Sequence, residues 1–107
     1  MSKPEKRIRI IYPNGSVKLA PYPRSGASAQ DAALHAAVEG YYERVPYTQN
    51  CWVNEEGLLL RLEENVPGRN EAHKLVPIKH RLEMDLGYQS YAGPVAIIEN
   101  VPTEKGE

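Results

Sequence analysis

The segment SAQDAALHAAVEGYYERVP, residues 28–46, holds the clearest secondary-structure pattern in this chain of 107 residues. Alanine is the strongest helix former, and the first two thirds of the segment are rich in it. Apolar side chains recur there at the i, i+3, i+4 and i+7 spacing of one helix face: Leu34, Ala37, Val38 and Tyr41. We therefore expect a helix from Ser28 to Gly40 that packs on the rest of the domain by this face.

Residue types typical of helix ends bound this segment. Ser28 is expected as the N-cap, with Asp31 in place of the Glu of a capping box. Gly40 is expected to end the helix in the left-handed conformation that glycine adopts readily. The residues that follow, Tyr41 to Val45, favour a strand, with Tyr41 packed under the helix.

The residues before the helix predict a β-hairpin. From Lys6 to Tyr12, β-branched and charged residues nearly alternate, which is typical of a strand with one buried face. Pro13 to Ser16 contain the Asn-Gly pair that tight turns favour, and Val17 to Pro21 continue the alternation.

A second hairpin is expected after the helix. Its strands would be Cys51 to Val53, with Trp52 packed against the sheet, and Leu58 to Leu62. The connecting turn would be closed by Gly57 in the left-handed conformation: Asn54, Glu55, Glu56 and Gly57. The acidic pair in this turn has two interpretations, a solvated structural turn or a contact for a ligand or partner.

The last third of the chain predicts a second helix and a buried strand. The pattern breaks between Asn65 and Gly68, and Asn70 is expected to cap a short helical turn that runs to Leu75. Apolar residues recurring every fourth position predict a shorter helix near Ile78 to Leu86. An unbroken apolar run within Pro94 to Glu99 predicts a central strand buried on both faces.

Together these elements predict a single α+β domain over residues 1–100, followed by a polar tail at 101–107. The sheet would be mixed or antiparallel with five or six strands, and the helix from Ser28 to Gly40 would cover one face. The second helix, near Ile78 to Leu86, would cover a margin of the domain or project from it as the variable element.

Composition narrows the classes of protein that this chain can belong to. Apolar residues make up 41% and the formal net charge is -1, so no strong overall field attracts nucleic acid or an anionic membrane. No apolar run approaches the ~20 residues of a membrane-spanning helix. The single cysteine, Cys51, cannot form an internal disulfide, which favours a reducing cytoplasm.

Several short motifs in sequence order resemble a family of small proteins. They are VEGYYERVP at residues 38–46, WVNEEGLL at 52–59, a group formed by Asn70, Ala72 and Leu75, and GPVAII at 93–98. These motifs resemble the family called domain of unknown function 3846, which is common in bacteriophages, plasmids and their bacterial hosts. The resemblance implies a mobile-element origin and an α+β fold, but no biochemical activity. The segment Glu71 to Tyr91 departs from that pattern by carrying an extra helical stretch.

Residue types used in catalysis and metal binding are present but scattered: His35, Cys51, His73 and His80. Their spacing matches neither a zinc site nor a cysteine nucleophile paired with a base. Phosphate-binding glycine loops and nucleophile elbows are missing from the sequence. We therefore expect no enzyme, no metal and no cofactor.

Two sets of residues are candidates for binding a partner. The first is a basic patch on the N-terminal hairpin that would hold phosphates or an acidic protein surface: Arg7, Arg9 and Lys18. Charges that protect an edge strand from pairing are the alternative. The second consists of tyrosines that would line a groove or a partner surface: Tyr42, Tyr47, Tyr88 and Tyr91. Their alternative role is to replace phenylalanine at the margins of the core.

The sequence therefore predicts a non-enzymatic binding or interaction protein of phage or mobile-element type, whose unknown partner would be a host or phage protein. Nucleic-acid binding through the basic hairpin is one alternative function. Binding of a small ligand in a pocket between helix and sheet is the other. The oligomeric state is left open.

Overall fold

The structure is a computed structural model that describes residues 5–81 and 91–102. The described residues form five strands and two longer helices, in the order β1 (Lys6–Ile11), β2 (Val17–Pro21), α1 (Ala27–Val38), β3 (Tyr42–Arg44), β4 (Cys51–Asn54), α2 (Val66–Leu75) and β5 (Val95–Asn100). Residues 78–81 form a further short helical segment. The rest of the helix expected near Ile78 to Leu86 lies outside the described residues, as do Tyr88 and most of the polar tail.

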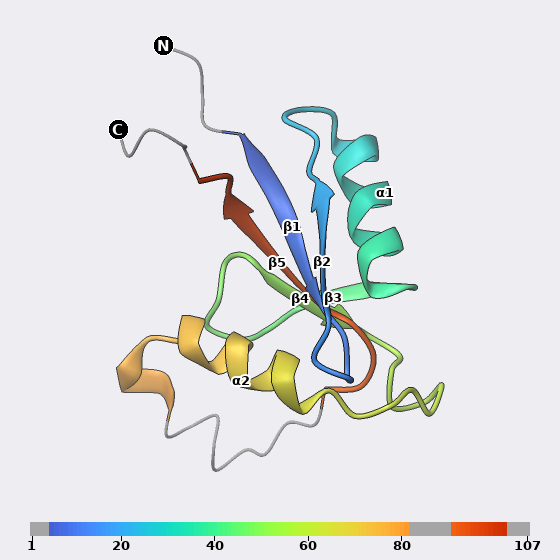
Figure 1. The fold of residues 1–107 in the computed structure, drawn as a ribbon, viewed down its shortest axis with the longest axis vertical. Helices are drawn as coiled ribbons and strands as arrows, with labels where there is room; N and C mark the ends of the chain where they lie inside the picture. Colours follow the sequence, from blue (N-terminus) through green and yellow to red (C-terminus); the bar gives the residue numbers. More distant parts are fainter. Residues whose placement is uncertain (1–4, 82–90, 103–107) are drawn as a thin grey trace.

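The strands form one sheet in the order β2-β1-β5-β4-β3, with every neighbouring pair antiparallel. This arrangement confirms the predicted α+β fold with a five-stranded antiparallel sheet (Figure 1). The N-terminal hairpin is present as expected. β5 lies at the centre between β1 and β4, so the apolar run near the C-terminus does form the central strand.

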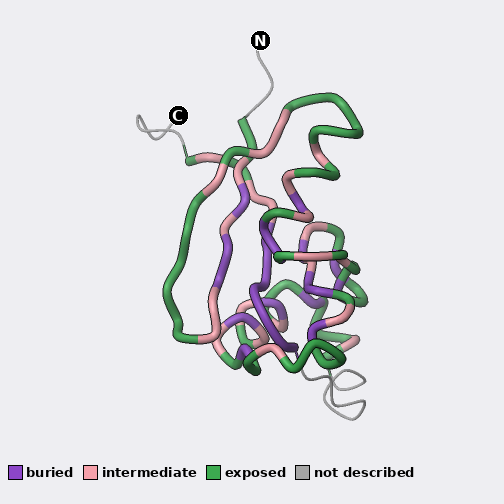
Figure 2. Tube along the Cα trace, turned by 90° about the vertical axis from the view of Figure 1, so that its right-hand side faces the viewer, coloured by how far each residue is buried: buried purple, intermediate pink, exposed green. Residues whose placement is uncertain are grey.

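The two helices cover opposite faces of the sheet. One core cluster joins α1 to the sheet: Ile8, Ile10, Leu34, Ala37, Val38 and Ala96. The other lies on the α2 side: Ile11, Val45, Cys51, Val53, Ala72, Val76, Tyr91, Val95 and Ile97. Buried residues are concentrated in β1, β4 and β5, whereas β2 and β3 have none, and Figure 2 shows the buried stretches gathered in the interior of the domain.

The ends of α1 differ from the prediction. Gly26, at φ 94°, is the N-cap, and no side chain caps the helix, so the expected Ser28 cap is wrong. Glu39, and not Gly40, adopts the left-handed conformation, at φ 63°. The helix therefore ends early enough to leave Tyr41 63% exposed instead of packed beneath it.

Gly40 is needed for a different reason. A Cβ at this position would lie 2.7 Å from the side-chain nitrogen of Asn54. That nitrogen donates to the carbonyl oxygen of Val38 at 3.0 Å, which ties the end of α1 to the end of β4. Glycine thus permits a close approach between the helix terminus and the sheet.

The second predicted hairpin is wrong. β4 pairs with β3 on one side and β5 on the other, so no edge of β4 is left for Leu58 to Leu62. Residues 55–61 instead form consecutive turns, and Gly57 does not have a positive φ. A Cβ at Gly57 would lie 2.3 Å from the carbonyl oxygen of Ala92, so close packing requires this glycine.

The start of α2 also differs from the prediction. The expected break from Asn65 to Gly68 is the first turn of the helix, capped by the Asn65 side chain, which accepts from the Gly68 N–H at 2.7 Å. Pro67 fits there because the first-turn N–H groups have no intrahelical acceptor. Asn70 lies within the helix and does not cap it.

Candidate functional site

The two arginines of the predicted basic patch lie on the α2 side of the sheet and are already paired with acids. Glu99 on β5 forms ion pairs with Arg7 at 2.7 Å and with Arg9 at 2.9 Å. Arg9 also contacts Glu71 of α2 at 3.2 Å. Burial opposes ionisation of Glu99, but its hydrogen bonds from both arginines outweigh this and hold its pKa below the ordinary value.

Lys18 does not join these arginines. It lies directly opposite Ile10 in the hairpin register, and residues directly opposite each other share a face of the sheet. Ile10 packs in the α1 cluster, so Lys18 is on the α1 side. The predicted three-cation patch is wrong because strand register separates its members.

The predicted tyrosines do not form one groove. Tyr42 lies on the α1 side, where its hydroxyl donates to Asp31 and its ring contacts Trp52 edge-on. Tyr47 stacks on His80, with 4.2 Å between ring centroids. Tyr91 is buried on the opposite side of the sheet from Tyr42, in the α2 cluster.

An open groove of about 520 Å³ lies between α1 and the sheet, where Leu34, Tyr42 and Trp52 contribute to its lining. This groove corresponds to the position of the small-ligand pocket expected from the sequence. The hydroxyl of Tyr42 in this groove donates to Asp31.

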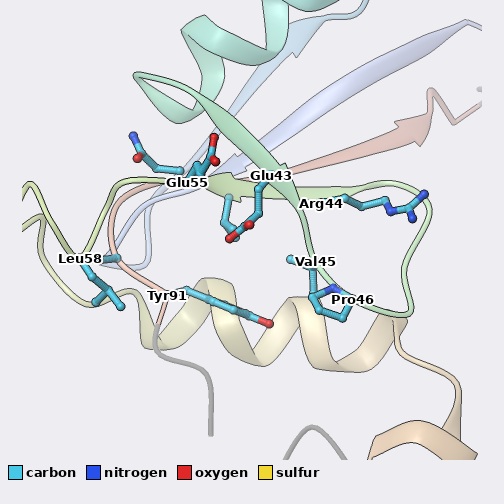
Figure 3. Close-up of a pocket in the computed structure, with 10 residues that line it drawn as sticks. Glu43, Arg44, Val45, Pro46, Glu55, Leu58 and Tyr91 are labelled. Carbon is cyan, nitrogen blue, oxygen red and sulfur yellow. The ribbon is translucent and has the colours of Figure 1, made fainter. Parts of the chain in front are cut away.

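A more enclosed cleft lies between β3, β4 and the residues that precede β5. Its volume is about 290 Å³, at the lower end of the ~300–1,000 Å³ typical of small-molecule pockets. The polar groups of interest here are Glu43, Glu55 and Tyr91, and the apolar ones include Val45, Pro46 and Leu58. Figure 3 shows the Glu43 carboxylate extending from β3 toward the Tyr91 ring, while Arg44 points away.

Tyr91 is the most unusual group of this cleft. Its side chain is only 5% exposed, and its hydroxyl has no hydrogen-bond partner among the described residues. Burial raises its pKa to about 12, and among the smaller effects of nearby charges Arg69 lowers the pKa while Glu43 raises it. Tyr91 is therefore a neutral phenol at physiological pH.

The backbone around the cleft is held by close contacts of the chain with itself. The Asn65 N–H donates to the Tyr91 carbonyl oxygen at 2.7 Å, and the Gly93 N–H donates to that of Glu63 at 2.8 Å. Gly57 packs against the Ala92 carbonyl. These contacts fix the position of Tyr91 relative to the strands.

The turn that contains Asn54, Glu55, Glu56 and Gly57 has the structural role predicted for it, although it does not close a hairpin. The side-chain oxygen of Asn54 accepts from the Glu56 N–H at 2.8 Å, and the Asn54 carbonyl accepts from the Gly57 N–H at 3.3 Å. Glu55 is exposed at the rim of the cleft.

Three consecutive leucines follow this turn and are exposed: Leu58 by 66%, Leu59 by 82% and Leu60 by 57%. Leu58 also lines the cleft. The predicted strand from Leu58 to Leu62 would have buried some of these side chains, so the sequence prediction did not indicate their exposure. The signal in the sequence was the unbroken leucine run itself, which does not alternate.

Cys51 is completely buried among apolar residues. Burial raises its pKa to about 12, so the thiol stays protonated and is a poor nucleophile. Within residues 5–81 and 91–102, no group of three or more His, Cys, Asp or Glu side chains is arranged to hold a metal ion. The helices described in those ranges also include none with the length and apolarity needed to cross a membrane.

Comparison of the chain with models of protein families, with curated proteins and with solved structures found no match.

Proposed function

We propose that this protein is a non-enzymatic interaction module that binds an extended segment of a partner protein along the leucine loop, residues 58–60, and the adjacent cleft. The observation that carries the proposal is the exposure of three consecutive leucines next to a partly enclosed cleft. Contiguous apolar surface at such a position is typical of sites that bind another protein.

The partner segment should combine apolar and basic residues. Apolar side chains would cover the leucines and remove their surface from water. Two acidic residues, Glu43 and Glu55, and one basic residue, Arg44, line the cleft, and the Arg44 side chain points away from the Glu43 carboxylate (Figure 3). Charge complementarity therefore favours a basic side chain beside the apolar ones.

The sequence resemblance supports a setting in bacteriophages or other mobile elements, with a host protein as the partner. A cytoplasmic location agrees with the free, buried cysteine. The protonated state of Cys51 supports a binding role over cysteine-based catalysis.

Selection of peptides by the intact chain tests this proposal. A display library of random twelve-residue peptides would be panned against the wild-type protein, and the enriched peptides measured against the double variant Leu59→Ser with Leu60→Ser. The control variant is Ile78→Ser, because Ile78 is 79% exposed and lies outside both the loop and the cleft. All three proteins would first be checked for equal thermal midpoints.

We expect enriched peptides that pair apolar with basic residues, bind the control as well as wild type, and bind the loop variant at least tenfold more weakly. Failure to enrich any peptide would count against the proposal. Peptides that bind the loop variant with undiminished affinity would also overturn it.

A further inference from the structure

We propose that the cleft between Glu43 and Tyr91 binds the guanidinium group of an arginine side chain in the partner segment. This inference rests on the function proposed above and adds the identity of the residue that the cleft recognises.

The first argument is the state of the Tyr91 hydroxyl. Buried side-chain hydroxyls nearly always have a hydrogen-bond partner, because leaving one unpaired loses the bonds it made to water. The Tyr91 hydroxyl has no hydrogen-bond partner among the described residues, although Tyr91 is only 5% exposed. Tyr91 lines the cleft, but its oxygen has almost no accessible surface, so a ligand there would supply the missing partner after a small shift of the ring.

The second argument is the carboxylate that faces the Tyr91 ring across the cleft. Glu43 lies on the edge strand β3, directly opposite Val53 of β4, and its carboxylate extends toward the Tyr91 ring (Figure 3). A ligand group between Glu43 and Tyr91 must donate a hydrogen bond to the carboxylate. It must also be compatible with the neutral Tyr91 phenol, whose oxygen can accept a hydrogen bond. A cationic donor satisfies both groups.

The third argument distinguishes arginine from lysine. A guanidinium has five N–H donors in a planar fork, so one group can donate to the Glu43 carboxylate and to the Tyr91 oxygen together. An ammonium group is a compact and strongly hydrated charge, which loses more on entering a confined site. The apolar walls formed by Val45, Pro46 and Leu58 suit the aliphatic stem of arginine.

Titration of the isotope-labelled intact chain with two matched tripeptides tests the inference. The probe is acetyl-Leu-Arg-Leu-amide, and its control replaces arginine by citrulline, which keeps the shape and removes the charge. Backbone amide shifts would be followed for residues 43–45 and 91–92. The variants are Glu43→Gln and Tyr91→Phe, with Glu39→Gln as a matched control because Glu39 is exposed at the end of α1 and does not line the cleft.

We expect the arginine probe to shift the amides around the cleft and the citrulline probe to bind about tenfold more weakly, as expected for the loss of charge-assisted hydrogen bonds. Glu43→Gln and Tyr91→Phe should each weaken binding of the arginine probe several-fold, and Glu39→Gln should not. Tyr91→Phe should keep or raise the thermal midpoint, since it removes an unpaired hydroxyl. If Tyr91→Phe does not fold, the test depends on Glu43→Gln, which changes an exposed residue, and on whether it weakens binding of the arginine probe.

Equal binding of the two probes, shifts confined to other parts of the protein, or an absence of binding at millimolar probe would each overturn the inference. The leucine-loop experiment is independent of this outcome. Peptides that require Leu59 and Leu60 but bind equally well with citrulline in place of arginine would support the proposed interaction function and contradict only the proposed recognition of arginine.

Discussion

The side-chain nitrogen of Asn65 donates to the carbonyl oxygen of Ile11 at 2.7 Å and so fixes the start of α2 to the end of β1. The same nitrogen donates to the Gly93 carbonyl at 2.8 Å, while the side-chain oxygen caps α2 at the Gly68 N–H. The side chain is fully buried. One residue thereby joins three segments behind the cleft, and its own N–H holds the backbone of Tyr91.

Replacing Asn65 should therefore destabilise the fold strongly. Asn65→Ala removes three buried hydrogen bonds and leaves two carbonyls and one N–H unpaired, so we expect a loss of about 3 kcal/mol or more in unfolding free energy. Asn65→Asp keeps the cap but sets a carboxylate against two carbonyl oxygens, and should be at least as harmful at neutral pH. Urea unfolding measures both, and a loss below ~1 kcal/mol for Asn65→Ala would contradict this account.

The packing of Gly57 predicts a cost for the smallest possible side chain. Gly57→Ala places a Cβ 2.3 Å from the Ala92 carbonyl, which is backbone and cannot move aside freely. We expect a loss of about 2–3 kcal/mol, as for overpacked cores. Gly15→Ala is the comparison, because a Cβ there meets nothing within 4 Å and suffers only from the φ of +88°, at a cost of about 1 kcal/mol. Equal losses in thermal or urea unfolding would show that the contact with Ala92 does not matter.

The ion pairs of Glu99 predict how stability depends on pH. The pKa of Glu99 is lower in the folded protein than its ordinary value of 4.5, because hydrogen bonds from Arg7 and Arg9 outweigh the opposing effect of burial. As the pH falls, the unfolded chain takes up this proton first, so acid favours unfolding. The stabilisation is complete above the unfolded pKa and is lost as the pH falls through the folded one.

Glu99→Gln should therefore lower stability at pH 7 by up to about 1 kcal/mol, the usual limit for partly exposed ion pairs. It should also flatten the fall in stability below about pH 5. Glu39→Gln is the control, as an exposed carboxylate at the end of α1. Urea unfolding at a series of pH values measures both variants, and identical pH profiles for wild type and Glu99→Gln would refute the prediction.

The parts of the fold that sequence reasoning found are those specified by local patterns. The N-terminal hairpin combines alternation with an Asn-Gly turn, and the run from Val95 to Ile98 is apolar on both faces. The body of α1 follows from its alanines and its apolar face. Each of these residue patterns lies within one short segment and predicts its secondary structure without knowledge of distant contacts.

The misassigned parts depend on contacts between distant segments. Gly57 is required by Ala92, and the role of Asn65 depends on Ile11 and Gly93, so no local pattern identifies either. The sequence predicts a strand for the leucines at 58–60. They form none because both edges of β4 are already paired, which the local sequence does not reveal. Of the candidate cleft, the sequence identified Glu55 and Tyr91 but missed Glu43, which meets Tyr91 only as a lining residue of the folded cleft.

The pairing of the N-terminal arginines leads to a prediction about nucleic acid. Glu99 is shared by Arg7 and Arg9, Glu71 also contacts Arg9, and Lys18 lies on the other face of the sheet. Phosphate binding depends on free positive charge, so we expect no retardation of duplex DNA or of RNA in gels at low salt. Glu99→Ala combined with Glu71→Ala would release both guanidinium groups and should produce weak, salt-sensitive retardation. Retardation by the wild-type protein that Arg7→Ala with Arg9→Ala abolishes would instead establish nucleic-acid binding by this hairpin.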